Sequence, residues 1–348
     1  MRTLLVTGGA GFIGSHFVER AVREGDQVVV LDCLTYAGHR ENLAHVKGAL
    51  ELIEGNICDG RLVLDLLQQH QVDELVNFAA ESHVDRSISE PSGFINTNIV
   101  GTFTLLNAAL QHFQKKPTFR YLQVSTDEVF GSLGATGKFH EESPITPNSP
   151  YSASKAAADH LVRAWHHTYG LPVVTTHCSN NYGPRQYPEK LIPHMIACAL
   201  RDKPLPVYGD GGNVRDWIHV EDHVEGIFLA LRQGRLGECY CFGGNAERNN
   251  LDLVKLICQT LDRLRPRSDG KPHASAITYV TDRLGHDRRY AIDDTHAQKE
   301  LGFKRRHEVE AGMASTVEWY VAHQAWCETV LGHREVVAGL SREGAKVL

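Results

Sequence analysis

The segment LLVTGGAGFIG, residues 4–14, decides the fold of this chain. An apolar run leads directly into a loop in which Gly8, Gly11 and Gly14 recur at every third position, and a helical pattern follows. Small residues at this spacing allow a tight turn and a close approach of the backbone to a pyrophosphate, which then lies at the positively polarised N-terminus of the helix. The segment therefore predicts the first strand, loop and helix of a dinucleotide-binding fold.

The second expected strand, residues 27–32, ends in VVVLD and supplies the acidic residue that such a fold uses. Asp32 is placed where a carboxylate accepts hydrogen bonds from the adenosine ribose. A carboxylate repels a 2′-phosphate and no arginine follows immediately, so NAD is favoured over NADP. A glycine-rich turn without a ligand is the alternative. Asp59 is a candidate for the adenine amino group or, equally, a helix N-cap before Arg61.

The first half of the chain alternates β-rich and helical runs, which predicts an α/β fold with a doubly wound parallel sheet of the Rossmann type. The β-rich runs are dominated by Val, Ile and Leu, as expected for strands covered on both faces. We expect strands at residues 3–7, 27–32, 50–54, 74–79, 120–125 and 173–178, and helices at 11–24, 61–70, 92–114 and 150–169.

After residue 179 the chain changes to segments punctuated by proline and glycine. We interpret residues 1–179 as an NAD-binding domain, to which 212–243 return, and 180–348 as a smaller substrate-binding domain. Helical periodicity resumes further on, with a flexible break expected at 265–275. The helices expected here are 220–232, 251–264, 294–301 and 308–324.

Composition excludes several classes of protein. With 36 basic and 42 acidic side chains the formal net charge is −6, so no broad basic field exists for nucleic acid or an anionic membrane. No apolar run is long enough to span a bilayer, and the glycines of the first segment argue against a signal peptide. Eight scattered cysteines favour reduced thiols and a cytoplasmic location. The 20 histidines form no compact ligand motif, so we expect no metal.

Two groups of residues carry the predicted chemistry. Tyr151 and Lys155 lie one helical turn apart after the fifth strand, where an ammonium and a nicotinamide cation lower the pKa of a phenol so that it acts as a base. Thr126, Asp127 and Glu128 follow that strand at the carboxyl edge of the sheet. A simple dehydrogenase needs one hydroxyl here, whereas loss of water across two carbons needs an acid and a base. A polar turn is the alternative interpretation of the acidic pair.

Eight segments together resemble the dTDP-glucose 4,6-dehydratase family of the extended short-chain dehydrogenase/reductase superfamily. They are TGGAGFIGSH, LDCLTYAGHRENL, AAESHVDRSI, STDEVFG, SPYSASKA, SNNYGPRQ, GDGGNVRDWIHVEDH and GHDRRYAID. The resemblance implies a lyase that converts dTDP-glucose to dTDP-4-keto-6-deoxyglucose and water in deoxysugar (dTDP-rhamnose) biosynthesis. It makes Tyr151 the base at the 4-hydroxyl, with Thr126 and Lys155 assisting, Glu128 the base at C5 and Asp127 the acid at C6. NAD takes hydride from C4, returns it to C6 and is regenerated in each turnover.

The same resemblance assigns residues to each ligand. Those around NAD are Gly8, Gly11, Phe12, Ile13, Gly14, Asp32, Cys33, Leu34, Thr35, Cys58, Asp59, Phe78, Ala79, Ala80, Thr97, Tyr151, Lys155 and Asn181. Those around the nucleotide sugar are Ser82, Thr126, Asn180, Lys190, Leu191, Pro206, Val207, Tyr208, Arg215, Asn250, Arg283 and His286. Arg215 and Arg283 suit the diphosphate as bidentate forks, although exposed surface arginines are the alternative.

Two departures from the family pattern, the short stretch 131–149 and Leu284 in place of proline, bear on the sugar site and on the Arg283–His286 turn. A related dehydratase or C4 epimerase for another nucleotide sugar shares the same fold, NAD loop and YxxxK pair, and a non-catalytic NAD sensor is a further alternative. The Thr126–Glu128 triplet argues against the epimerase, and the presence of Tyr151 and Lys155 together with it argues against the sensor. Apolar positions on the helices expected at 92–114 and 150–169 predict a homodimer, and the resemblance implies that these helices pair with those of a second copy in a four-helix bundle.

Overall fold

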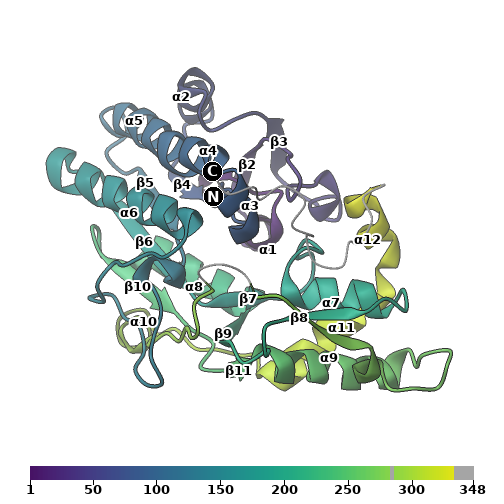
Figure 1. Cartoon of the computed structure of the whole chain (residues 1–348). Helices are drawn as coiled ribbons and strands as arrows, with labels where there is room; N and C mark the ends of the chain where they lie inside the picture. The colour runs from purple at the N-terminus through teal and green to yellow at the C-terminus, as the bar shows by residue number, and fades with distance from the viewer. Residues whose placement is uncertain (283–285, 333–348) are drawn as a thin grey trace.

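A seven-stranded parallel sheet forms the centre of the molecule in the computed structural model, which describes residues 1–282 and 286–332 (Figure 1). The order of the strands reverses between β1 and β4, and in such folds ligands bind outside the carboxyl ends of the strands at this point. The predicted doubly wound sheet is therefore confirmed, with β10 as an additional edge strand. The spatial order is β10 (Cys239–Phe242), β6 (Val173–Cys178), β5 (Arg120–Val124), β4 (Glu74–Asn77), β1 (Thr3–Thr7), β2 (Gln27–Asp32) and β3 (Leu50–Glu54).

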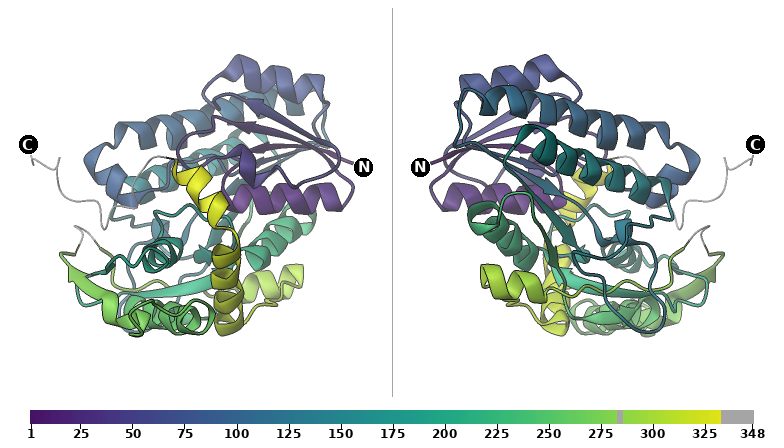
Figure 2. Two further views of the ribbon diagram at one scale, coloured as in Figure 1. Left: turned by 90° about the vertical axis from the view of Figure 1, so that its right-hand side faces the viewer. Right: turned by 90° about the vertical axis from the view of Figure 1, so that its left-hand side faces the viewer.

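Helices cover both faces of this sheet (Figure 2). On one face α1 (Phe12–Arg23) packs against α8 (Val220–Gln233), where the rings of Phe17 and Phe228 stack with centroids 4.5 Å apart. On the other face Leu66, Leu105 and Val162 share one buried cluster. They belong to α2 (Gly60–Gln69), α5 (Thr102–Phe113) and α6 (Pro150–Tyr169).

The α-helix predicted at 92–114 differs in its first half. It consists of α4 (Ser92–Phe94), a π-helical stretch from Ile95 to Gly101, and α5. Asn98 within this stretch is buried, exchanges hydrogen bonds with the backbone of Glu81 and donates to Ser154. Wider helical turns of this kind occur often at functional sites, and here the turn directs an amide side chain between β4 and α6.

A second unit with its own core lies below the carboxyl edge of the sheet (Figure 1). It has a three-stranded sheet and a strand pair, and α8 and β10 leave it to return to the large sheet. The predicted helices in this half occur, with ends shifted by up to two residues. Its elements are β7 (Asn180–Tyr182), β9 (Val214–His219), β11 (Glu247–Asn249), β8 (Leu205–Tyr208), β12 (Ile277–Val280), α7 (Leu191–Ala199), α9 (Asn250–Leu264), α10 (Thr295–Leu301), α11 (Val309–Ala322) and α12 (Gln324–Leu331).

The stretch 131–149 joins this unit to the end of β5. Phe139 forms a parallel bridge with Ile292, and the Asn148 amide donates to Asp287 Oδ1 at 2.7 Å. The short stretch is thus anchored against residues 287–292 beside the carboxyl end of β5. Within the described residues, no helix has the length and apolarity to cross a membrane.

Candidate active site

The glycine loop after β1 leaves no room for side chains at two of its positions. Gly8 has φ +69°, and a Cβ placed there would lie 2.6 Å from the backbone nitrogen of Ala79 at the end of β4. A Cβ on Gly14 would lie 2.3 Å from the Gly8 carbonyl oxygen. The loop therefore folds tightly onto β4 and the start of α1, which is the geometry that brings backbone amides to a pyrophosphate.

Asp32, at the carboxyl end of β2, organises this loop. Its Oδ2 accepts a hydrogen bond from the Ala10 amide, and its Oδ1 accepts one from the Leu34 amide, both at 2.9 Å. Burial raises the pKa of the Asp32 carboxyl, while these two hydrogen bonds lower it. The side chain thus fixes the shape of the site in addition to the ribose contact predicted for it.

The other predicted cofactor residues lie along the carboxyl ends of β1 to β4. The N-cap interpretation of Asp59 is confirmed, because its Oδ1 accepts from the amides of Arg61 and Leu62 at 3.1 and 3.0 Å. Cys58 contacts the π-helical stretch that contains Thr97, with its Sγ 3.4 Å from the Asn96 carbonyl. Phe12 and Ile13 open α1, Cys33 to Thr35 follow β2, and Phe78 to Ala80 follow β4.

Asn181 makes contacts that its sequence motif did not predict. Its amide donates to the Ser179 carbonyl at 3.0 Å, and its carbonyl oxygen pairs with His223 Nδ1 of α8 at 2.9 Å. The side chain is therefore engaged within the protein and fastens β7 to α8, while the contact with NAD stays a prediction.

The five predicted catalytic residues come from two adjacent elements. The extended residue Thr126 follows β5 and caps a 3₁₀ turn, Asp127–Phe130, by accepting from the Glu128 amide at 3.3 Å. Tyr151 and Lys155 lie in the first two turns of α6, which begins with a Ser149–Ser152 capping box and Pro150 at its first position. The local sequence thus fixes the start of the helix that carries the YxxxK pair.

Asp127 is suited to donate a proton. It is only 2 % exposed, and its Oδ2 has no hydrogen-bond partner in the described part of the chain. Burial, followed by the negative charges of Glu128 and Asp216, raises its pKa well above the ordinary value, against a smaller opposing effect of Arg215. Glu128 beside it is more accessible. One strand end therefore presents a buried carboxyl group, whose raised pKa favours the protonated form, next to a second and more accessible carboxyl group.

Tyr151 and Lys155 are both buried at this strand end. Burial and then the Glu128 charge raise the pKa of the Tyr151 phenol well above its usual value, while a hydrogen bond with Thr126 lowers it. The Lys155 ammonium donates to the Val124 carbonyl at 2.7 Å. Among the protein groups, burial outweighs the favourable interaction with Thr126, and the combined effect of Lys155 and a nicotinamide cation on this pKa stays a prediction.

The predicted substrate residues divide into two groups. Asn180 and Asn250 each carry a buried Oδ1 without a hydrogen-bond partner among the described residues, so their side chains have acceptor capacity for a ligand. Lys190 instead donates to the Ser82 carbonyl at 2.8 Å. Leu191 begins α7, and Pro206, Val207 and Tyr208 lie in β8.

Arg215 has partners within the protein, and its contact with the diphosphate stays a prediction. Its guanidinium donates to the carbonyls of Val214, Asp287 and Arg288, and it lies 4.3 Å from the ring centroid of Tyr290. The residue therefore holds the 287–290 segment against β9. Arg283 and Leu284 lie outside the described residues, whereas His286 Nδ1 pairs with Asp282 at 2.6 Å.

A contact across the two units reaches the glycine loop and was not predicted. Trp326 of α12 donates through Nε1 to Asn42 Oδ1 at 3.0 Å, and Asn42 Nδ2 donates to the Ala10 carbonyl at 2.8 Å. Figure 2 shows α12 rising from the second unit toward α1. A single buried asparagine in a loop carries no sequence signal for such a contact.

One group of side chains has the composition of a metal site. Among the described residues, His219, Glu221 and His307 bring possible ligand atoms within 4.8 Å of one another. The two imidazoles stack face to face with centroids 4.0 Å apart, so their in-plane lone pairs do not converge on one point. Hydrogen bonds to Asp222 and Glu221 raise the pKa of His307 to about 9. This group therefore holds a proton between carboxylates in the arrangement described.

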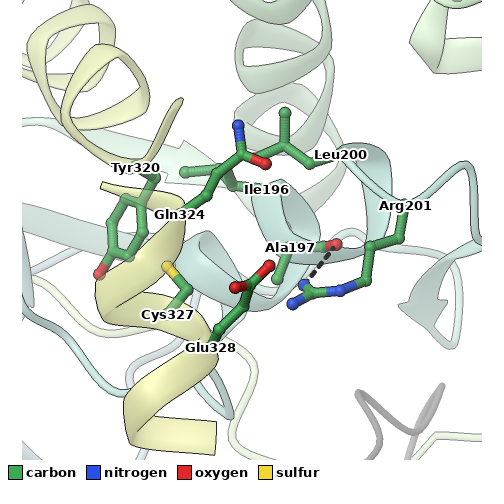
Figure 3. A pocket seen from close by; sticks show the side chains of 8 residues that line it. All are labelled: Ile196, Ala197, Leu200, Arg201, Tyr320, Gln324, Cys327 and Glu328. Atoms are coloured by element: carbon green, nitrogen blue, oxygen red, sulfur yellow. Dashed lines mark hydrogen bonds between the residues drawn. The ribbon is translucent and has the colours of Figure 1, made fainter. Parts of the chain in front are cut away.

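A small hollow of about 80 Å³ lies between α7 and α12, away from the catalytic strand end (Figure 3). Its polar groups bond within the protein: the Arg201 guanidinium donates to the Ala197 carbonyl, and the Tyr320 hydroxyl donates to the Gln186 carbonyl. Cys327 of α12 faces it and is buried. The hollow is a packing feature that seats α12 on the second unit.

Comparisons with known proteins agree with this geometry. The family model described as GDP-mannose 4,6 dehydratase matches residues 5–316. The dTDP-glucose 4,6-dehydratase of Xanthomonas campestris pv. campestris (strain B100) is 59% identical over 338 residues, which cover 95% of this chain and 96% of that protein. The crystal structure of the dTDP-glucose 4,6-dehydratase DesIV from Streptomyces venezuelae, with NAD and TYD bound, has a TM-score of 0.87 and 46% identity, with 94% and 99% coverage. The UDP-glucose 4-epimerase of Thermotoga maritima, with UDP-glucose, has a TM-score of 0.82 at 28% identity, with 92% and 99% coverage.

Proposed function

Because this chain belongs to the dTDP-glucose 4,6-dehydratase family, we propose that it converts dTDP-glucose to dTDP-4-keto-6-deoxyglucose and water with bound NAD. The observation that carries this proposal is the strand end after β5. There a buried Asp127 with a raised pKa stands beside Glu128, and Thr126, Tyr151 and Lys155 lie next to them. A C4 epimerase has no need of a proton donor for a departing hydroxyl.

The residues of the first unit suit NAD. The glycine loop, with its close approach to Ala79, would hold the pyrophosphate, and Asp32 would accept from the adenosine ribose. Bound NAD would supply the hydride acceptor for C4 and, once reduced, the hydride donor for C6. We propose the division into an NAD-binding domain of residues 1–179, joined by 212–243, and a nucleotide-sugar domain made by the rest of 180–348. The return of α8 and β10 to the large sheet supports this division for residues 220–243, whereas β9 (Val214–His219) pairs with β7 and β11 of the second unit.

The chain's own residues would then handle three protons. Tyr151 takes the proton of the sugar 4-hydroxyl with the Thr126 hydroxyl in hydrogen-bond contact. Once C4 is a ketone, the C5 hydrogen is acidic and Glu128 removes it. Asp127 gives its proton to the C6 hydroxyl, which leaves as water while the C5–C6 double bond forms. Return of a proton to C5 and of hydride to C6 completes the 6-deoxy product.

Incubation with a panel of nucleotide hexoses tests this function. We expect a 4-keto-6-deoxy product from dTDP-glucose, NAD in the denatured protein and no net reduction of NAD in step with product. A 4-epimer as the product would instead establish the epimerase alternative. NAD binding with no turnover of any nucleotide hexose would establish the sensor alternative.

We further propose a homodimer and a cytoplasmic location. Ile88, Ile95, Val100 and Phe103 are exposed on α3 (Val84–Ser89), the π-helical stretch and α5, which adjoin α6. Burial of these side chains in a four-helix bundle with a second copy supports the dimer. We expect light scattering to give the mass of a dimer and Phe103→Glu to reduce it to that of a monomer. Leu236→Glu is the control, because Leu236 is exposed but lies outside these helices, and it should leave the dimer mass unchanged. Eight unpaired thiols support the location.

A further inference from the structure

A buried carboxylate that the proposed reaction does not use lies behind the catalytic pair. Asp159 follows Lys155 by one turn on α6 and is 7 % exposed. Its Oδ2 accepts a hydrogen bond from the Ser125 hydroxyl at 2.6 Å and contacts His177 Nε2 at 3.1 Å. A single carboxylate oxygen therefore connects α6 to the ends of both β5 and β6.

Ser125 connects this carboxylate to the catalytic strand end. It stands between Val124, whose carbonyl accepts from the Lys155 ammonium at 2.7 Å, and Thr126. Its own carbonyl lies 3.5 Å from the Cys178 Sγ, and its amide donates to Thr176 of β6. Every polar atom of Ser125 is thus engaged, and a change at Asp159 reaches Lys155 and Thr126 through one residue.

The negative charge of Asp159 acts on the pKa values of two buried basic side chains, Lys155 and His177. Burial lowers the pKa of Lys155, and the negative charge of Asp159 is the largest opposing effect. Burial also lowers the pKa of His177, but the hydrogen bond with Asp159, together with the nearby Cys239 and Cys241 side chains, outweighs it and holds that pKa well above the usual value. One carboxylate therefore serves two buried cations. The other groups that face the three are Tyr121 on β5, Cys178 on β6, Cys239 and Cys241 on β10, and the Phe130 ring.

Two further observations mark this cluster as more than packing. Asp159 Oδ1 and His177 Nδ1 are buried without a hydrogen-bond partner among the described residues. Unpartnered polar atoms of this kind are costly and are retained where a charge has a role. We propose that Asp159 is a positioning residue for the C4 oxidation of the proposed reaction: it keeps the Lys155 ammonium charged inside the protein and, through Ser125, fixes the strand end that carries Thr126.

The proposal predicts shifts of opposite sign in two variants. Asp159→Asn removes the counter-charge, so the pKa of Lys155 falls by about one unit or more. His177→Gln removes the competing cation and keeps a donor to Asp159, so the pKa of Lys155 rises. Protein labelled with ¹³C at the lysine Cε reports this pKa directly, because the Lys155 signal is assigned by its loss in Lys155→Met. This measurement needs no turnover.

Asp26→Asn is the matched control, since Asp26 is a buried carboxylate at the opposite end of the sheet and is paired with Arg232 at 2.6 Å. It should lower thermal stability and leave the Lys155 titration unchanged. If Asp159→Asn and His177→Gln both leave the pKa of Lys155 where it is, or move it in the same direction, the proposal is wrong. If Asp159→Asn does not fold, the rise in His177→Gln still decides the question.

Rates separate this proposal from the proposed function. The alkaline limb of the pH profile for formation of reduced dinucleotide from dTDP-glucose should move with the pKa of Lys155, down in Asp159→Asn and up in His177→Gln. Opposite shifts of the NMR titration in a protein that turns over no nucleotide sugar would sustain the role of Asp159 and remove the function. Turnover of dTDP-glucose with the alkaline limb unchanged in both variants would support the function and remove the role of Asp159.

Discussion

The two sides of the proposed active site are built differently. On the side of β5 and α6, Thr126 and Lys155 have hydrogen-bond partners within the protein, and of the catalytic groups there Asp127 keeps a buried Oδ2 without a partner among the described residues. On the side of the second unit, Asn180 and Asn250 have buried acceptors without partners. Preorganised groups favour chemistry and unsatisfied ones favour a ligand. The difference supports the proposal that the first unit carries the reactive groups and the second unit selects the substrate.

Loss of the base is the strongest test of this division. Tyr151→Phe keeps the ring against Phe94 and removes the hydroxyl, so C4 oxidation and every later step should fall together, by about 10⁴-fold. Product formation and single-turnover absorbance of reduced dinucleotide measure both. Appearance of the absorbance signal at the normal rate would show that another group takes the 4-hydroxyl proton.

The acid and base of elimination should separate from oxidation. Glu128→Gln and Asp127→Asn leave Tyr151 and Lys155 in place, so reduced dinucleotide should accumulate transiently while product falls by about 10²- to 10³-fold. Rapid mixing with dTDP-glucose followed by product analysis measures the two steps. Full dehydratase activity in both variants would contradict the roles given to these carboxyl groups, and failure before any absorbance signal would contradict the separation.

Sequence reasoning predicted the first unit better than the second for a physical reason. Strands such as Thr3–Thr7 and helices such as Pro150–Tyr169 are set by local periodicity and caps, and both occur with the predicted bounds. The strands β7, β8 and β9 take their pairing from residues distant in the chain, which a local pattern does not contain. The π-helical stretch was missed because Asn98 bonds to groups far along the chain.

The same reason applies to the site. Motif positions predicted which residue types gather at the sheet edge, and Thr126, Asp127, Tyr151 and Lys155 do lie together. The motif for Arg215 did not reveal that backbone carbonyls occupy its guanidinium. Contacts such as these depend on tertiary geometry, so they become visible only in the folded chain.

The buried acid should reveal itself in stability as well as in rate. The folded-state pKa of Asp127 is raised, so protonation favours the folded protein: this contribution is full below the unfolded value of about 3.9 and is lost as the pH rises through the folded value. Asp127→Asn needs no proton, and it should therefore raise the unfolding temperature relative to wild type by several degrees at pH 8 and by less at pH 5. An equal difference at both pH values would argue against a protonated Asp127.

The smallest expected effect concerns the contact that joins the two sides. Trp326→Phe keeps an aromatic ring on α12 but removes the donor to Asn42, whose amide bonds to the Ala10 carbonyl in the glycine loop. Loss of one such hydrogen bond corresponds to about 1 kcal/mol, so the affinity for NAD should weaken by about fivefold while kcat at saturating NAD changes little. Trp319→Phe is the matched control, because Trp319 adjoins the Trp326 ring at 5.2 Å and has no place in this chain of hydrogen bonds to the loop. Calorimetric titration of NAD into dinucleotide-free protein measures the difference. Equal affinity in the two variants would mean that α12 supports only the second unit, and the two sides of the site would then be coupled by the ligands alone.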